Sequence, residues 1–312
     1  MAARLDAELV RRGLARSRRE AAALVAAGRV RVGGETVTRP STPVPADDDV
    51  EVDRPADDAG WASRAAHKLE GSLVALDRAG LAVPVAGAVC LDVGASTGGF
   101  TDVLLRRGAR RVVAVDVGHG QLVDRLRQDP RVDVREGVNA RDLDARDLDE
   151  APAVVVGDLS FISLGHVLPA VGRVAGPAAS VLLLVKPQFE VGRERLGAGG
   201  VVRDPSLRAD AVLGVADAAT RAGWTVRAVV PSSLPGPHGN RELFLLLVRP
   251  APPGTGATAA GDPETFELRE AVRAAVAAPV APAADEWSAP PAPAAFVVRV
   301  GGRDDNDEEV GA

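Results

Sequence analysis

The chain has 312 residues, a formal net charge of −6 and a single cysteine, Cys90. This length is enough for one large domain and a smaller one. One cysteine excludes an internal disulfide, and no apolar run approaches the roughly 18 residues of a membrane span, so we expect a soluble, cytoplasmic protein.

Residues 1–52 are interpreted as a small α+β module. A stripe of apolar residues predicts a first helix, and a capping box at residues 17–20 predicts a second helix that ends at Gly28. Two short strands follow, at 29–32 and 36–38. Gly33-Gly34 joins them and supplies the positive φ of a hairpin turn.

Arginine is concentrated in this module, because the first 41 residues hold nine arginines against four acids. Such an excess suits a polyanionic partner. The segment RLDAELVRRGLARSRREAAALVAAGRVRVGGETVTRP resembles the S-four-type RNA-binding module, and the resemblance implies contacts with RNA phosphates. The candidate RNA-binding residues are Arg4, Arg11, Arg12, Arg16, Arg18 and Arg19.

A linker at residues 53–62 is predicted from its proline, glycine and acidic residues. We expect Trp61 to pack at the domain junction, and stacking on an RNA base stays open as the alternative. From residue 63 to 250, seven apolar runs alternate with helix-length segments. This alternation predicts a doubly wound α/β sheet of seven strands. The runs lie near residues 87–93, 111–116, 132–135, 153–158, 181–186, 225–230 and 243–248.

A glycine-rich turn, DVGASTGG at residues 92–99, follows the first of these strands and leads into a helix. Its backbone can approach a ligand closely, although nicotinamide and flavin enzymes use similar loops. The second strand ends in Asp116, which is placed to accept hydrogen bonds from a ribose diol. Loop and acid together favour an adenosine-bearing cofactor.

Lysine occurs only at Lys68 and Lys186, whereas the other basic residues are arginines. A lysine amine can release its proton in acid–base chemistry, which an arginine does not do. Asp158 closes the fourth strand and Lys186 closes the fifth, so both are expected beside the cofactor cleft. Asp158-Leu-Ser-Phe lacks the Asn/Asp-Pro-Pro-aromatic signature of enzymes that methylate base amino groups, which favours a hydroxyl acceptor.

Several segments together resemble the TlyA family of ribosomal-RNA 2'-O-methyltransferases, which have an FtsJ-like Rossmann-type methyltransferase domain. They include WASRAAHKLEGSL, LDVGASTGGFTDVLLRRGA, GDLSFISL, LLLVKPQFEVGRERLGAGGVVRDP and LPGPHGNRELFLLL. The resemblance covers residues 1–250. It implies a catalytic tetrad of Lys68, Asp158, Lys186 and Glu242. It also implies S-adenosyl-L-methionine as cofactor, held by Gly94, Ser96, Thr97, Gly98, Gly99, Asp116 and Asn139.

The family implies methylation of a cytidine ribose in ribosomal RNA of the ribosomal subunits. A ribose hydroxyl is a poor nucleophile, so a base must take its proton, and we assign Lys186 to that role with Lys68 nearby to favour proton release. The four histidines form no ligand-spaced cluster, and we expect no metal. Two alternatives stay open: a non-catalytic ribosome-binding factor with a degenerate methyltransferase fold, and a cytolytic, haemolysin-like protein.

The C-terminal tail, residues 251–312, contains 11 acids against four arginines and much alanine and proline. One helix is predicted at 264–277. The remaining composition does not bury enough surface to offset the entropy of ordering. We therefore expect residues 279–312 to be disordered and dispensable for methyl transfer.

Overall fold

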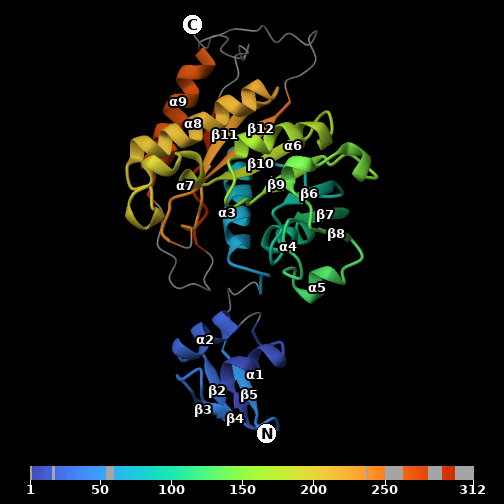
Figure 1. Cartoon of the computed structure of the whole chain (residues 1–312), viewed down its shortest axis with the longest axis vertical. Helices are drawn as coiled ribbons and strands as arrows, with labels where there is room; N and C mark the ends of the chain where they lie inside the picture. The colour runs from blue at the N-terminus through green and yellow to red at the C-terminus, as the bar shows by residue number, and fades with distance from the viewer. Residues whose placement is uncertain are drawn as a thin grey trace, which may run out of the picture. The chain divides into compact units, whose positions relative to one another are not determined.

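The structure is a computed structural model that describes residues 2–15, 18–53, 60–236, 238–249, 263–279 and 290–298. The chain divides into two compact units, the first formed by residues 1–62 and the second beginning at Ser63 (Figure 1). Within the described residues, no helix combines the length and the apolar character needed to cross a membrane.

The first unit packs two helices, α1 (Leu5–Arg11) and α2 (Arg18–Ala26), around a small apolar core that includes Leu9 and Leu24. The predicted hairpin is confirmed, because Gly33 and Gly34 have φ values of 58° and 84° between antiparallel strands. The predicted capping box includes Ser17, which lies outside the described residues. The strands are β1 (Ala3–Arg4), β2 (Val30–Val32), β3 (Glu35–Thr36), β4 (Pro43–Val44) and β5 (Val50–Val52), in sheets β1-β4 and β3-β2-β5.

The second unit is built on one sheet in the order β13-β11-β12-β10-β9-β6-β7-β8. The five strands from β10 to β8 run parallel, and β12 is antiparallel to both of its neighbours. All seven predicted strands are present, and β13 is an eighth strand that was not predicted. The strands are β6 (Val89–Val93), β7 (Arg111–Asp116), β8 (Val132–Glu136), β9 (Val154–Gly157), β10 (Ser180–Val185), β11 (Thr225–Pro231), β12 (Leu243–Val248) and β13 (Phe296–Val297).

Strand order reverses at β6: the next two strands in sequence, β7 and β8, lie on one side of it, and β9 and β10 lie on the other. Open parallel sheets leave a crevice at such a reversal, beyond the carboxyl ends of the strands. The loops after β6, β7, β9 and β10 therefore face a common region, and the residues that follow these strands are the ones brought together there.

Helices cover both faces of the sheet (Figure 1). On one face α4 packs against β6 and β7, and Thr101 of α4 bonds the inward side chain of Asp92. Side chains alternate along a strand, so Leu91 and Val93 point to the other face, where they share a core with α6, α8 and α9. The helices are α3 (Ala65–Arg78), α4 (Gly99–Arg106), α5 (Asp124–Arg127), α6 (Leu168–Val174), α7 (Pro187–Glu190), α8 (Pro205–Arg221) and α9 (Pro263–Ala277).

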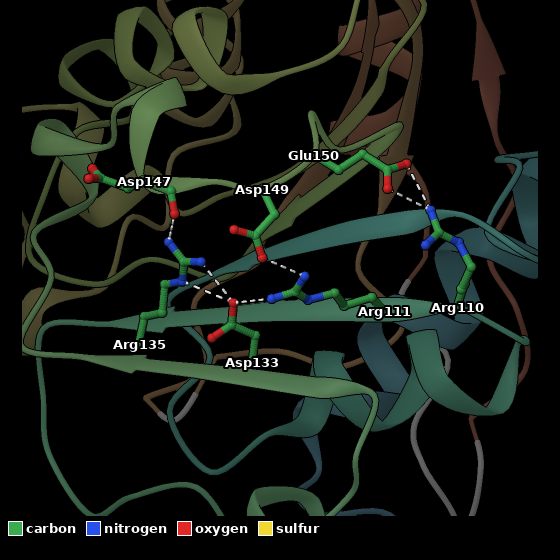
Figure 2. A network of polar contacts seen from close by, with 7 residues as sticks. All are labelled: Arg110, Arg111, Asp133, Arg135, Asp147, Asp149 and Glu150. Carbon is green, nitrogen blue, oxygen red and sulfur yellow. Dashed lines mark hydrogen bonds and ion pairs between the residues drawn. The ribbon is translucent and has the colours of Figure 1, made fainter.

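A network of polar contacts lies along β7 and β8, at the far side of the sheet from β13 (Figure 2). Asp133 of β8 receives both Arg111 and Arg135, each at 2.8 Å. These side chains are partly exposed, so each pair adds little stability by itself. The other members are Arg110, Asp147, Asp149 and Glu150.

The C-terminal tail differs from its prediction. The predicted helix is present as α9, and it buries Val272 and Val276 against the core. The expectation of disorder from residue 279 is wrong for residues 290–298, since β13 pairs antiparallel with β11 and Val298 is buried. Phe296 and Val298 pack against the core. The prediction missed them because it rested on the average composition of the whole tail. The other residues beyond 279 lie outside the described residues.

Candidate active site

Lys186 and Asp158 form an ion pair at the carboxyl ends of two adjacent parallel strands. Asp158 follows β9 and Lys186 follows β10. Lys186 Nζ lies 2.7 Å from Asp158 Oδ1 and donates a hydrogen bond to Ser160 Oγ at 2.8 Å. The two charged side chains are 10% and 17% exposed, so this pair retains a path to solvent.

Lys68 and Glu242 form a second ion pair, which is more deeply buried. Lys68 lies on α3 and Glu242 immediately precedes β12. Lys68 Nζ is 2.5 Å from Glu242 Oε2, and the two side chains are 6% and 0% exposed. Removing one partner of such a buried pair strongly destabilises the fold, because the other charge is left buried without its partner. The two lysines of the chain are thus each matched with a separate carboxylate.

The loop before β12 is held by hydrogen bonds between the Asn240 side chain and the backbone of a neighbouring segment. The Asn240 side chain accepts a hydrogen bond from Val202 N and donates one to Gly200 O, each at 2.9 Å. Gly236 lies against Glu242, and a Cβ there would come within 2.5 Å of Glu242 Oε1. A side chain at position 236 would therefore displace the Glu242 carboxylate, so glycine at this point permits its observed position.

The glycine-rich turn after β6 adopts the conformation expected of a ligand loop. Gly94 has φ of 86°, and a Cβ would lie 3.0 Å from Asp158 O, so glycine permits the close approach of the two loops. Asp116 accepts hydrogen bonds from Ser96 N at 2.8 Å and Gly118 N at 2.7 Å. A carboxylate has further lone pairs for a ribose diol.

Two adjoining cavities lie over these loops. The larger, of about 500 Å³, is lined by Asp116 and Asn139 on one side and by Asp158 on the other. The smaller, of about 150 Å³, is lined by Thr97, Gly99 and Lys186. Gly94, Ser96, Asp158 and Ser160 line both. The space above the turn is of the size that cofactors occupy, and it leads to the Lys186 amine, so the residues present fit an adenosine-bearing cofactor.

Gly98 serves packing and is not among the residues that line the two cavities, whereas Gly99 serves packing and also lines the smaller cavity. A Cβ on Gly98 would meet Leu126, and one on Gly99 would come within 3.1 Å of Ala65 Cβ at the start of α3. Asn139 caps a short 3₁₀ turn through Arg141 N and also lines the larger cavity. Six of the seven expected cofactor residues therefore line one or both of the two cavities, and Gly98 does not.

Asp92 lies beneath the turn and is completely buried. Its Oδ2 accepts a hydrogen bond from Thr101 Oγ1 at 2.6 Å, while its Oδ1 has no hydrogen-bond partner among the described residues. Burial raises the pKa of Asp92 to about 7, and the nearby charges of Asp158 and Asp116 act in the same direction. A carboxyl that is partly neutral near pH 7 therefore underlies the cavity.

Phe161 was not among the predicted site residues. It is 91% exposed at the rim of the larger cavity, has φ of 64°, and its ring lies 5.2 Å from that of Phe189. A bulky residue at positive φ indicates local strain, which accumulates at functional sites. Its loop is held by Glu190, which accepts hydrogen bonds from Ser163 Oγ and Leu164 N.

The arginines of the first unit are engaged in local contacts. Arg4 and Arg18 contact Asp6, and Arg11 and Arg12 contact Glu8. Arg12 also donates to backbone oxygens between residues 45 and 48 and is 19% exposed, so its main contacts are within the unit. Arg4, Arg11 and Arg18 are 53–61% exposed and accessible to a polyanion. Arg16 and the Arg19 side chain lie outside the described residues.

No cluster of three or more potential metal ligands occurs in the part of the chain that the structure describes. The geometry offers two adjoining cavities, one lined by Asp116 and the other by Lys186, beside the exposed aromatic ring of Phe161. Ser160 and Phe161 were not predicted as site residues, although both belong to the segment Asp158-Leu-Ser-Phe that follows the fourth predicted strand.

Family models match both units. Residues 61–249 match the FtsJ-like methyltransferase model, and residues 3–50 match the S4 domain model. A relative from Mycobacterium tuberculosis, the 16S/23S rRNA (cytidine-2'-O)-methyltransferase TlyA, is 54% identical over 245 residues, which are 78% of this chain and 89% of the relative. Hemolysin A of Brachyspira hyodysenteriae is 40% identical over 206 residues, covering 66% and 82% of the two chains.

Solved structures agree with these matches. A protein from Streptococcus thermophilus assigned as a hemolysin superposes with a TM-score of 0.65 at 34% identity, covering 88% of this chain and 95% of the other. A similarly assigned protein from Lactococcus lactis gives a TM-score of 0.57 at 39% identity and covers 61% and 89%.

Proposed function

The chain belongs to the TlyA family of FtsJ-like methyltransferases, and from this premise we propose that it transfers a methyl group from S-adenosyl-L-methionine to the 2'-hydroxyl of a cytidine in ribosomal RNA. The observation that carries the proposal is the Lys186–Asp158 pair, which opens onto the cavity above the glycine-rich turn. A base at this position lies where the methyl acceptor would enter.

When bound, S-adenosyl-L-methionine supplies a methyl group on a positively charged sulfur, which a weak oxygen nucleophile can accept if the atoms are aligned. Asp116 would hold the ribose of the cofactor, and the turn at Gly94–Gly99 would hold its amino-acid end. Asn139 would complete the pocket beside Asp116. These residues bind and orient, and they add no chemistry of their own.

Lys186 is the proposed general base. Its amine, when neutral, has a lone pair that takes the proton of the ribose hydroxyl as the oxygen attacks. Asp158 and Ser160 fix the direction of Nζ, since both lie within 2.8 Å of it. The partial exposure of this pair gives the proton a route to solvent after each turnover. Lys68 and Glu242 support the site from the interior.

RNA binding is proposed for the S4 domain and for the rim of the cavity. Arg4, Arg11 and Arg18 would contact phosphates, which fix the position of an RNA without reading its sequence. The exposed ring of Phe161 suits stacking on an unpaired base, as single-stranded RNA is commonly recognised. Ribosomal subunits or their RNA are the proposed partners.

The test is a mass-spectrometric map of 2'-O-methyl sites in rRNA that has been incubated with purified protein and S-adenosyl-L-methionine. We expect at least one new methylated cytidine with the wild-type chain and none with Lys186→Met. Calorimetry should give the same cofactor affinity for both proteins. New methylation on bases rather than riboses, or equal methylation by the variant, would contradict the proposal.

A further inference from the structure

Arg208 is a buried cation without a counter-ion. It lies near the start of α8 and is 7% exposed. Within the described residues its Nε is enclosed without a hydrogen-bond partner, while its two terminal nitrogens are not among the enclosed unpaired atoms. Burying an unpaired charge is costly, so proteins nearly always pair such groups. An arginine left in this state is a candidate for binding an anion that comes from outside the chain.

The charges around Arg208 strengthen this reading. Burial and the neighbouring charge of Arg241 lower the pKa of Arg208, and only Asp204 acts in the opposite direction. The Asp204 carboxylate is already used as the N-cap of α8, where it accepts hydrogen bonds from Ser206 N and Ser206 Oγ at 2.8 Å. The positive charges of Arg208 and Arg241 therefore act on each other, and the one acid that offsets them, Asp204, already accepts hydrogen bonds at the start of α8.

The location connects this pair of arginines to the catalytic residues. Arg241 directly precedes Glu242 in the chain, and it is anchored by a hydrogen bond to Ala278 O at the end of α9. The segment that leads into α8 is tied to the same loop, because Val202 N bonds the Asn240 side chain. Arg208 and Arg241 thus lie beside the loop that delivers Glu242 to the site.

We propose that Arg208 and Arg241 form a binding site for a phosphodiester group of the RNA substrate, adjacent to the nucleotide that is methylated. This inference rests on the proposed function. A phosphodiester suits two guanidinium groups, because its oxygens accept several charge-assisted hydrogen bonds at once. It is also the anion that an RNA chain presents next to every ribose. Binding there would hold the strand in register with Lys186.

The test compares Arg208→Met with Arg221→Met. Both residues lie on α8, and Arg221 is an exposed arginine at the other end of the helix. Binding of a small-subunit rRNA transcript is measured over a salt series, together with cofactor affinity by calorimetry and the Tm of the free protein. Arg208→Met should weaken RNA binding about tenfold and reduce the salt slope by about one, whereas Arg221→Met should leave both nearly unchanged.

Stability separates a binding site from a structural role. Removing an unpaired buried charge should leave the Tm of the free protein unchanged or higher, and cofactor affinity should not change. RNA binding by Arg208→Met equal to wild type would overturn the inference. If that variant does not fold, Arg241→Gln decides: a reduced salt slope supports the site and an unchanged slope overturns it.

The proposed function fails separately, if the wild-type chain binds the transcript with this salt dependence yet transfers no methyl group to it.

Discussion

The two lysine–carboxylate pairs contain the same residue types in different environments. Lys68–Glu242 joins a helix to the start of a strand and is almost completely buried, with side chains 6% and 0% exposed. Lys186–Asp158 joins the ends of two strands at the rim of a cavity, with 10% and 17% exposed. The two pairs therefore differ in access to water, and this difference is the basis for proposing proton exchange at Lys186 and a mainly stabilising contact at Lys68.

The largest effect should come from breaking the buried pair. Lys68→Met leaves the Glu242 carboxylate enclosed without its partner, so the free energy of unfolding should fall by about 3–5 kcal/mol. Urea denaturation measures this change. The double variant Lys68→Met/Glu242→Gln should recover much of the loss, because no buried charge remains. A loss below about 1 kcal/mol in the single variant would mean that the pair does not stabilise the fold.

The next largest effect concerns the more exposed pair, Lys186–Asp158, and should appear in the rate of methyl transfer. Arginine at position 186 keeps the charge but does not release its proton at ordinary pH, so Lys186→Arg should slow single-turnover methyl transfer by ~10²-fold or more. Affinity for the cofactor and for RNA should change little. Rates are compared over a pH series. Near wild-type turnover with an unchanged pH profile would rule out Lys186 as the base.

A third effect concerns the pH dependence of stability and comes from Asp92, whose pKa is raised by burial and by the nearby charge of Asp158. Below the pKa that Asp92 has in the unfolded chain, its carboxyl is neutral in both the folded and the unfolded state, so it does not lower the free energy of unfolding. As pH rises toward about 7, the unfolded chain ionises first, and stability falls. From pH 5 to pH 8 the wild type should lose roughly 2 kcal/mol that Asp92→Asn does not lose. The free energy of unfolding is measured by denaturation at both pH values. An equal change from pH 5 to pH 8 in the wild type and in Asp92→Asn would contradict this assignment.

The smallest effect should follow from removing the second partner of Lys186. Ser160→Ala deletes one hydrogen bond to Nζ and leaves the ion pair with Asp158 in place. The rate should fall about tenfold, as expected for the loss of one orienting bond to a charged group. Single-turnover kinetics measure it, with unchanged cofactor affinity as the control. A loss as large as that of Lys186→Arg would assign Ser160 a direct part in the chemistry.

The sequence predicted the fold of the second unit and the residues at its strand ends. Asp158 and Lys186 could be placed beside each other because parallel strands end at a common edge, and this depends only on strand periodicity. Glu242 came from the resemblance to a family. Its pairing with Lys68 joins residues 174 positions apart, which no local pattern encodes.

The unpredicted features depend on tertiary contacts. In the sequence, Arg208 is indistinguishable from an arginine on the exposed face of a helix. Only the structure shows that it is buried and that its Nε has no hydrogen-bond partner among the described residues. Phe161 is exposed and its backbone takes a positive φ, which phenylalanine itself does not favour, so neither feature could be read from its residue type. Arg12 is mainly a structural residue, because the carbonyl groups it contacts lie more than 30 positions away.

The short strand β13 has a consequence for the solubility of the protein. Without it, β11 would present unpaired N–H and C=O groups along the border of the sheet, a template for strands of other molecules. At the opposite border, β8 is protected by the charges of Asp133 and Arg135 instead (Figure 2). One border is closed by backbone pairing and the other by ionic side chains, so a chain shortened before residue 290 should self-associate through β11.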